Sequence, residues 1–422
     1  MSARNRELAN LLAVGILTGL GFASVYIARS AEVSSESLSY AAFFFALYLA
    51  AHVVARLTVP FADPYLLPMA ALLTAIGLTE IYRIDPEDAF RQGRWVAIGT
   101  AFFAATLFVL RRDYRRLERY KYLFGLGALI LLALPALPGI GTTVNGARLW
   151  VRIGSFQFQP GEVAKLMLIV FLAGYLRDKR EVLARGRLKD FGPLLIIWGG
   201  AMAVLLQTND LGSGLLLFGI FLGMLYVATA RASFAAAGVV LFAGGAAAVY
   251  QLVPRVRLRV SSWLDPWQDA DGGGYQIIQS TYSIASGGFG GTGLGRGTFT
   301  TTGGTELIPY LKTDFIYSAL AQELGLVGIS ALLLVYMLFV LRGFRTALLA
   351  SDGFSKLLAA GLTFGFALQT FIIIGGILRL IPLTGITLPF VSYGGSSVLA
   401  NFVLLAGLML VSNRANATTR AA

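Results

Sequence analysis

The feature that most constrains this chain is a series of apolar stretches, each about 20 residues long, that recurs from one end to the other. A helix of that length crosses the hydrocarbon core of a bilayer, where only helices and closed barrels satisfy their own backbone hydrogen bonds. Apolar residues run continuously in these stretches and do not alternate with polar ones, which favours helices over a barrel. Only 13% of the 422 residues are charged and 56% are hydrophobic, which argues against a soluble domain.

The pattern therefore predicts an all-α integral membrane protein, a multi-spanning helical bundle of about 12 transmembrane helices. The first stretch is longer than a signal-peptide core, lacks a clear small-residue cleavage site and is soon followed by another, so we expect it to be retained. The predicted spans are 8–28, 38–57, 65–82, 93–110, 121–138, 160–177, 192–207, 211–229, 233–253, 314–341, 355–377 and 387–412.

Basic residues in short connections predict the orientation of the bundle. "RRDYRRLERYK" (111–121) and "RDKREVLARGRLKD" (177–190) each carry six Lys or Arg residues, and with twelve spans both fall on the same side as the N-terminus. Cytoplasmic loops are enriched in Lys and Arg, so this side and both termini are predicted to be cytoplasmic. Much of the net charge of +12 then serves as a topology signal and contacts anionic membrane lipids. No basic domain with interleaved aromatic residues is present, which argues against nucleic-acid binding.

The composition also excludes several catalytic classes. The chain has no cysteine and therefore no thiolate nucleophile, disulfide or cysteine metal site. Its one histidine, His52, lies in the apolar stretch "ALYLAAHVVARL", where we expect a packed or hydrogen-bonded core residue. A histidine-based zinc site or a Ser-His-Asp triad would lack parts.

The longest predicted external connection is the segment 254–313. It opens with Arg255, Arg257 and Arg259, and "YQIIQSTYSIA" within it predicts a short amphipathic helix at the membrane surface. Long loops escape the rule that places positive charge inside, so these arginines need another explanation. An anionic ligand at the outer surface provides one, because the planar guanidinium donates two parallel hydrogen bonds to phosphate.

A glycine run at 287–297 follows the amphipathic segment. Gly288, Gly290 and Gly293 fit the pattern G-x-G-x-x-G, but no parallel strand precedes them, so we reject a dinucleotide site. Two interpretations stay open from composition alone: phosphate binding through backbone N–H groups, and a flexible linker.

Two acids accompany the next apolar span. Asp314 lies at its start, where capping of the helix is sufficient to explain it, whereas Glu323 near mid-helix must be paired or line a cavity. Nine residues turn a helix by about 180° and raise it by about 13 Å, so the two acids lie on opposite faces. This helix alone therefore cannot supply a two-carboxylate glycosidase site.

Further polar residues interrupt the apolar pattern elsewhere. Glu162 and Lys165 in "QPGEVAKL" are three residues apart on one helical face and can pair. Asp210 in "QTNDLGSG" can cap the helix that starts at Leu211. Arg379 lies in the external connection before the last span and can reach the same outer surface as the arginines of the segment 254–313.

Several stretches together resemble the SEDS family (shape, elongation, division and sporulation), whose members include RodA, FtsW and SpoVE. They occur in family order and spacing from about residue 64 to 412. The resemblance is carried by "NGARLWVRIGSFQFQPGEVAKL", "NDLGSG", "GYQIIQS…SGGFGGTGLGRG", "TDFIYSALAQELGLVG" and "PLTGITLPFVSYGGSS".

The resemblance implies a ten-helix SEDS core preceded by two additional helices, as in the RodA-type proteins of actinobacteria. The expected organisation is two extra transmembrane helices in 1–62, the glycosyltransferase core in 63–413 with its large extracytoplasmic loop 254–313, and a short cytoplasmic tail, 414–422.

The function that the resemblance implies is that of a peptidoglycan glycosyltransferase in the bacterial cytoplasmic membrane. Such an enzyme polymerises lipid II into β-1,4 glycan strands on the outer face, for cell elongation, shape or division, with a class B penicillin-binding protein as transpeptidase. Asp314 matches the essential acid of the family and is expected to be the general base, kept ionised by the helix N-terminus. Undecaprenyl pyrophosphate would be the leaving group. A divalent cation stays open as a cofactor, although no dedicated carboxylate cage for one is visible.

The remaining candidate residues are expected to bind substrate. The basic residues are candidates for stabilising the negative charge of the pyrophosphate. The acids and Lys165 are candidates because their positions match the family. These candidates are Glu162, Lys165, Asp210, Arg255, Arg257, Arg259, Arg296, Glu306, Lys312, Glu323 and Arg379. Three motifs depart from the family pattern, because Q-P-S/A-E is "QPGE", Q-P-D is "TND" and E-E-L-G is "QELG".

Two other classes of function compete with the enzyme. A lipid II flippase would use the same basic cavity and intramembrane acids, but it needs a polar path that reaches both faces. A non-catalytic scaffold would only position the transpeptidase.

Overall fold

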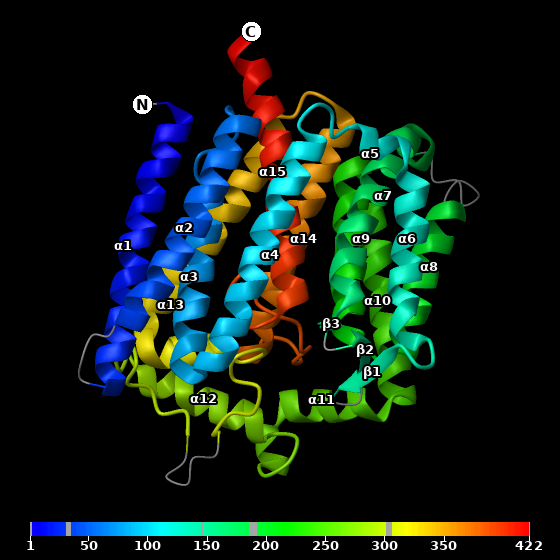
Figure 1. Cartoon of the computed structure of the whole chain (residues 1–422). Coiled ribbons are helices and arrows are strands. Elements are labelled where there is room, and N and C mark those ends of the chain that lie inside the picture. The colour runs from blue at the N-terminus through cyan, green and yellow to red at the C-terminus, as the bar shows by residue number, and fades with distance from the viewer. Residues whose placement is uncertain are drawn as a thin grey trace.

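The computed structural model describes residues 2–30, 35–144, 147–154, 156–184, 192–300 and 306–421. Each of the twelve predicted spans overlaps a helix of one bundle (Figure 1). These helices are α1 (Ala3–Ser30), α2 (Ser35–Thr58), α3 (Leu66–Ile84), α4 (Pro86–Leu110), α6 (Lys121–Ala133), α7 (Pro160–Ala184), α8 (Gly192–Gln207), α9 (Leu211–Thr229), α10 (Ala232–Leu252), α13 (Ile316–Leu349), α14 (Gly353–Ile377) and α15 (Gly395–Ala421).

Their lengths and compositions fit a multi-pass membrane protein. Among the described residues, nine helices are long and apolar enough to cross a membrane, and two shorter apolar helices, Lys121–Ala136 and Gly192–Gln207, run beside them. The last span was predicted to begin at residue 387, which is wrong. Residues 387–394 are not helical, and α15 begins only at Gly395, after Pro389 and Gly394 of this stretch.

The two ends of the bundle differ. Both termini and the four-residue helix α5 (Arg116–Arg119) lie at one end, and the helices of the segment 254–313 cross the other end (Figure 1). The basic run 111–121 is therefore on the same side as the N-terminus, as the predicted topology requires. Which side is cytoplasmic stays a prediction.

The described parts of the segment, 254–300 and 306–313, contain more helix than their composition suggested. The predicted amphipathic helix is confirmed as α12 (Tyr275–Gly287). A second helix, α11 (Pro254–Leu264), was not predicted, and it carries the three arginines at the start of the segment. A short 3-10 helix, Pro266–Asp269, joins the two.

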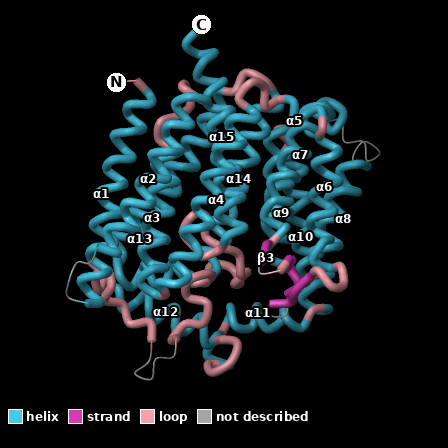
Figure 2. Tube along the Cα trace, in the orientation of Figure 1, coloured by secondary structure: helices cyan, strands magenta, loops and turns pink. Residues whose placement is uncertain are grey.

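A small antiparallel sheet lies in the connection between α6 and α7, residues 138–159, another of the three connections that the twelve-span pattern places outside (Figure 2). Its strands are β1 (Gly141–Val144), β2 (Ala147–Ile153) and β3 (Phe156–Phe158), in the order β1-β2-β3. Val151 is the register partner of Gly141 on one side and of Phe158 on the other. A single 3-10 turn, Leu134–Ala136, leads from α6 into the sheet.

Helices α1 and α2 are attached to the rest of the bundle by both apolar and polar contacts. Phe22 of α1 lies edge-on against Tyr82 of α3, with ring centroids 5.5 Å apart. His52 is buried, and its Nδ1 is 2.7 Å from a carboxylate oxygen of Glu7, which confirms a hydrogen-bonded core histidine. Arg4 pairs with the same carboxylate and donates to the carbonyl oxygen of Ala62, just before α3.

The non-helical stretch before α15 lies inside the bundle. Phe390 and Val391 are buried, and Pro389 accepts a 2.7 Å hydrogen bond from the hydroxyl of Tyr336 in α13. Gly77 of α3 approaches this stretch so closely that a Cβ there would lie 2.3 Å from the carbonyl oxygen of Val391. The backbones of α3 and of the stretch are therefore in direct contact.

This contact predicts that Gly77→Ala destabilises the protein. The new methyl group must push the stretch away from α3, and overpacking of this kind costs about 1–3 kcal/mol. We expect a lower midpoint of thermal unfolding for the purified protein in detergent. The control is Gly19→Ala in α1, where a Cβ meets no atom within 4 Å. Equal midpoints for the two variants would show that the close approach is not rigid.

Candidate active site

Asp314 lies just outside the helix that it was expected to cap. Helix α13 begins at Ile316, Phe315 is its N-cap residue without a side-chain hydrogen bond, and no acid lies in the first turn. Asp314 belongs to the turn before it, where its N–H donates to the carbonyl oxygen of Tyr310 at 3.0 Å. Helix capping is therefore the wrong explanation for this residue.

A guanidinium group faces the Asp314 carboxylate across a glycine. A Cβ at Gly385 would lie 3.7 Å from both Oδ2 of Asp314 and Nη2 of Arg259, so the two charged groups border the same small space. Gly385 has φ = 74°, a left-handed conformation that favours glycine. Arg259 is held in place by a 3.2 Å hydrogen bond from Nη1 to the carbonyl oxygen of Thr384.

Burial adjusts the protonation of both groups. It raises the pKa of Asp314 to about 6, and the Arg259 charge and a hydrogen bond from Thr313 oppose that rise. Burial also lowers the pKa of Arg259, and the nearby Arg255 lowers it further, whereas Asp314 and Asp210 raise it. The guanidinium of Arg259 favours the ionised form of Asp314. The expected contribution of the helix N-terminus stays a prediction. A carboxylate with a pKa near 6 is a stronger base than an ordinary aspartate.

Asp210 approaches the same region from α9. Its carboxylate accepts a 3.0 Å hydrogen bond from the N–H of Ser213, which confirms the predicted cap. Burial raises the pKa of Asp210, with Glu162 repelling and Arg259 attracting its charge. A Cβ at Gly212 would lie 2.7 Å from the carbonyl oxygen of Thr384, so the start of α9 rests on the same stretch that holds Arg259.

Lys165 and Glu162 form the predicted pair on α7. Lys165 Nζ is 2.8 Å from Glu162 Oε2 and donates a second hydrogen bond, of 2.6 Å, to Oε1 of Gln369. The amide of Gln369 donates in turn to the carbonyl oxygen of Thr387 at 2.9 Å. Gln369 was not predicted as part of the site, because no pattern in its own helix indicates this role. Its partner Lys165 lies 204 residues away along the chain.

Lys312 is neutralised by acids of α4. Its ammonium group lies 2.8 Å from Asp85 and also pairs with Asp88. The hydrogen bond from Lys312 is the main reason that the pKa of Asp85 is lowered. Because these two acids already neutralise the Lys312 charge, they oppose its predicted role in binding the pyrophosphate. Lys312 instead connects the turn before α13 to the start of α4.

Arg379 supports α11 and does not point at Asp314. Its Nη2 donates to the carbonyl oxygens of Trp263 at 3.0 Å and Leu264 at 3.1 Å, which are the last carbonyls of α11. Trp263 returns a hydrogen bond from Nε1 to the carbonyl oxygen of Arg379 at 2.9 Å. A basic side chain at the C-terminus of a helix is stabilising, and here it fixes the helix that carries Arg259.

The glycine run is anchored to Glu323. The N–H groups of Gly295 and Gly297 donate to the two carboxylate oxygens at 2.7 and 2.9 Å, and Arg83 Nε lies 3.3 Å away. The N–H of Gly293 donates to the Glu323 carbonyl oxygen at 3.0 Å. Both earlier interpretations of this part of the run are therefore wrong: these N–H groups are taken by protein acceptors, and the backbone is fixed and not a free linker. The expectation that Glu323 is paired is confirmed.

A second carboxyl group next to Glu323 was missed. Glu80 of α3 is completely buried, and neither of its oxygens has a hydrogen-bond partner within the described part of the chain. Glu80 and Arg83 stand in "LTEIYRID", where charges at the end of an apolar span were the available signal.

The other predicted residues lie at the surface of the same end. Arg257, Arg296 and Glu306 are exposed, and Arg255 is partly buried. Glu306 forms an isolated bridge with Thr300. The structure thus brings together Asp314, Arg259, Asp210, Glu162 and Lys165 around residues 384–387, and uses Lys312, Arg379 and Glu323 to hold the surrounding loops. In the described residues, no group of three or more His, Cys, Asp or Glu is arranged to hold a metal ion.

Comparison with known proteins identifies relatives along almost the whole chain. The family of cell cycle proteins that comprises FtsW, RodA and SpoVE matches residues 64–417. The peptidoglycan glycosyltransferase RodA of Mycobacterium tuberculosis is 42% identical over 99% of this chain and 92% of its own length. Stage V sporulation protein E of Bacillus subtilis is 36% identical over 83% of this chain and 96% of its own.

Solved structures have the same fold. A chain from work on "polymerization and crosslinking by a peptidoglycan synthase complex" superimposes with a TM-score of 0.70 at 29% identity, covering 84% of this chain and 98% of that one. The rod shape determining protein RodA of Thermus thermophilus gives a TM-score of 0.61 at 27% identity, covering 84% and 97%.

The anchoring of the glycine run predicts that Glu323→Gln loosens it. A carboxamide presents one oxygen and one NH₂ group to two N–H donors, so either Gly295 or Gly297 loses its acceptor. An unsatisfied buried donor costs about 1–3 kcal/mol. We expect a lower unfolding midpoint and faster proteolytic cleavage between residues 288 and 297. Glu306→Gln, at an exposed acid of the same segment, is the matched control, and equal cleavage of both variants would contradict the anchoring role.

Proposed function

This chain belongs to the FtsW/RodA/SpoVE family of SEDS proteins and is a peptidoglycan glycosyltransferase, and we propose that it polymerises lipid II with Asp314 as general base. The observation that carries the assignment is that the Asp314 carboxylate and the Arg259 guanidinium border the same space at Gly385. Glycosyl transfer from a pyrophosphate releases a proton from the acceptor hydroxyl and develops negative charge on the leaving group. A base and a cation that border one small space can take up the proton and stabilise that charge.

The proposed reaction uses both groups. The acceptor sugar hydroxyl gives its proton to a carboxylate oxygen of Asp314 while the hydroxyl oxygen attacks the anomeric carbon of the donor. The bond between that carbon and the pyrophosphate oxygen breaks, and undecaprenyl pyrophosphate leaves with the electron pair. Attack from the opposite side inverts the configuration and forms the β-1,4 bond. Arg259, with Arg255 and Arg257 on the same helix, offsets the charge that develops on the leaving group.

The other predicted residues are assigned supporting roles. Lys165, Glu162 and Asp210 lie beyond Arg259 and keep the far side of the site polar and charged. We assign Lys312, Arg379 and Glu323 to holding the turn before α13, helix α11 and the glycine run. Arg296 and Glu306 are exposed at the same end, where they can contact the growing strand.

The orientation and the partner follow from the same premise. If the basic connections are cytoplasmic, the end that carries α11 and α12 faces outward, which is where lipid II is polymerised. A structural relative at 29% identity comes from a synthase complex in which polymerisation and crosslinking are coordinated. We therefore infer that this chain works with a transpeptidase, a class B penicillin-binding protein.

The enzyme fits the structure better than a flippase does. The charged residues around Asp314 all lie at the α11 end of the bundle, whereas a flippase needs a polar path between both faces. A scaffold without chemistry would not require a carboxylate whose pKa is raised to about 6 beside a half-buried guanidinium.

Replacement of the base is the direct test. Asp314→Asn keeps the shape of the side chain but cannot accept the proton, and general bases contribute about 10²–10⁴-fold to rate. We expect glycan strands made from labelled lipid II in liposomes to fall by at least 10²-fold, with binding of the transpeptidase retained. Polymerisation that survives this replacement would remove Asp314 from the mechanism, and lost partner binding would indicate a structural effect instead.

The pKa of Asp314 predicts the pH dependence of polymerisation. Below its pKa of about 6 the carboxyl group is protonated and cannot act as a base, so the rate should rise with pH to half its maximum near pH 6. Arg259 lowers this pKa, and Arg259→Gln should therefore move the midpoint to higher pH.

The exposed Arg257 on the same helix provides the control, since it is not among the groups that set the pKa of Asp314. Arg257→Gln should leave the midpoint of the pH profile in place. Identical profiles for the two arginine variants would mean that the titrating group is not Asp314.

A further inference from the structure

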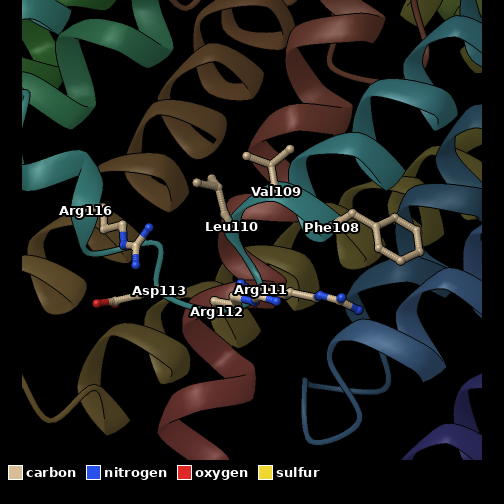
Figure 3. A pocket seen from close by; sticks show the side chains of 7 residues that line it. All are labelled: Phe108, Val109, Leu110, Arg111, Arg112, Asp113 and Arg116. Carbon is tan, nitrogen blue, oxygen red and sulfur yellow. The ribbon is translucent and has the colours of Figure 1, made fainter.

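A cavity lies at the end of the bundle opposite to the proposed active site. It has a volume of about 370 Å³ and opens where α4 ends and the chain turns toward α5. Its lining consists of Phe108, Val109, Leu110, Arg111, Arg112, Asp113 and Arg116 (Figure 3). The volume falls within the range of about 300–1,000 Å³ that is usual for small-molecule sites.

The charge of this cavity is positive and not neutralised from within. Arg111, Arg112 and Arg116 are exposed, and none has an acidic partner in the described ranges of the chain. Asp113 is the one acid in the lining, and it is already engaged by Arg115 at 2.9 Å and by Arg414 at 3.5 Å. Three guanidinium groups are therefore available for an external anion.

One wall of the cavity is apolar and faces outward from the bundle. Val109 is 76% exposed and Phe108 is 45% exposed, on the last turn of a membrane-spanning helix. Figure 3 shows Val109 and Leu110 on one side of the chain and Arg111, Arg112 and Asp113 on the other. The guanidinium of Arg111 lies over the ring of Phe108, 5.5 Å from its centroid, so basic and apolar groups meet at this point.

A free anion would use the arginines but leave the apolar wall without a partner. The negative end of the α4 dipole also disfavours an anion here unless several cations outweigh it, and three arginines do. A ligand with a charged headgroup and hydrocarbon chains matches both surfaces, and the cavity lies where headgroups meet hydrocarbon at the end of a span. The general attraction of basic loops to the membrane does not require such a cavity.

We propose that this cavity is a binding site for the phosphodiester headgroup of an anionic glycerophospholipid, with its acyl chains along Phe108 and Val109. Arg111, Arg112 and Arg116 hold the phosphate. The site is separate from the lipid II reaction, because α4 runs from this cavity to Asp85 and Asp88 at the other end of the bundle. Anionic lipid should therefore stabilise the folded protein without being a substrate.

The test uses the full-length protein in detergent with added phosphatidylglycerol or phosphatidylcholine. Native mass spectrometry counts retained lipids, and thermal unfolding reports stabilisation, because a ligand that binds only the folded state raises its unfolding midpoint. We expect phosphatidylglycerol, and not phosphatidylcholine, to be retained and to raise the midpoint. The combined variant Arg111→Gln, Arg112→Gln and Arg116→Gln should bind phosphatidylglycerol at least tenfold more weakly.

The matched control removes the same charge from other exposed positions outside the cavity lining. Lys179→Gln, Arg180→Gln and Arg231→Gln together should retain wild-type lipid binding, since none of these residues lines the cavity. Equal losses in both combined variants would overturn the proposal in favour of diffuse attraction. If the first variant unfolds early without lipid, the single change Arg112→Gln replaces it, and unchanged binding there would count against the site.

Inorganic phosphate distinguishes a lipid site from an anion site. At equal concentration it should neither displace phosphatidylglycerol nor raise the unfolding midpoint, because it lacks the apolar part. Stabilisation by phosphate alone, equal to that by phosphatidylglycerol, would overturn the assignment to a lipid.

Discussion

The structure depends on a non-helical stretch of chain, residues 378–394, that starts at the surface near α11 and is largely buried inside the membrane bundle from Ile386 onward. Backbone that leaves the helical conformation at this depth is tolerated only when protein groups satisfy its carbonyls and N–H groups. Here side chains from four different helices do so. The carbonyls of Thr384, Thr387, Pro389 and Ser392 accept from Arg259 of α11, Gln369 of α14, Tyr336 of α13 and Gln92 of α4.

These same hydrogen bonds create the site. Arg259 is fixed over Thr384, which places its second nitrogen beside Gly385 and opposite Asp314. The hydroxyl of Ser392 donates to the Thr313 carbonyl at 2.6 Å, so the turn that carries Asp314 is tied to the stretch as well. Burial at this crossing raises the pKa of Asp314 to about 6, and the guanidinium limits the rise. The cost of irregular backbone inside the bundle is thus offset by groups that also form the proposed site.

Hydropathy and local spacing predicted what depends on neighbours in sequence. The twelve helices follow from apolar runs, the Glu162–Lys165 pair from a three-residue spacing, and the Asp210 cap from its place before α9. What failed depends on distant partners. Capping by Asp314 was wrong because α13 starts two residues later, and the predicted start of α15 was wrong because the stretch before it is held by other helices. Nothing local reveals that the N–H groups of the glycine run end on Glu323 of α13.

The two helices that precede the family match pack against the rest of the bundle, and α1 does so at the end that carries the glycine run. The family match begins at residue 64, yet a Cβ at Gly295 would lie 2.6 Å from Cβ of Ala28, near the end of α1. Gly295 is also a donor to Glu323 Oε2, so α1 closes over the glycine run at the point where α13 holds it from the other side. Helix α1 also contacts α3 through Phe22 and Tyr82, one residue before Arg83, which pairs with Glu323. Helix α1 therefore contacts the loops around the proposed site at two adjacent points, and the start of the family match at residue 64 does not mark a break in the packing.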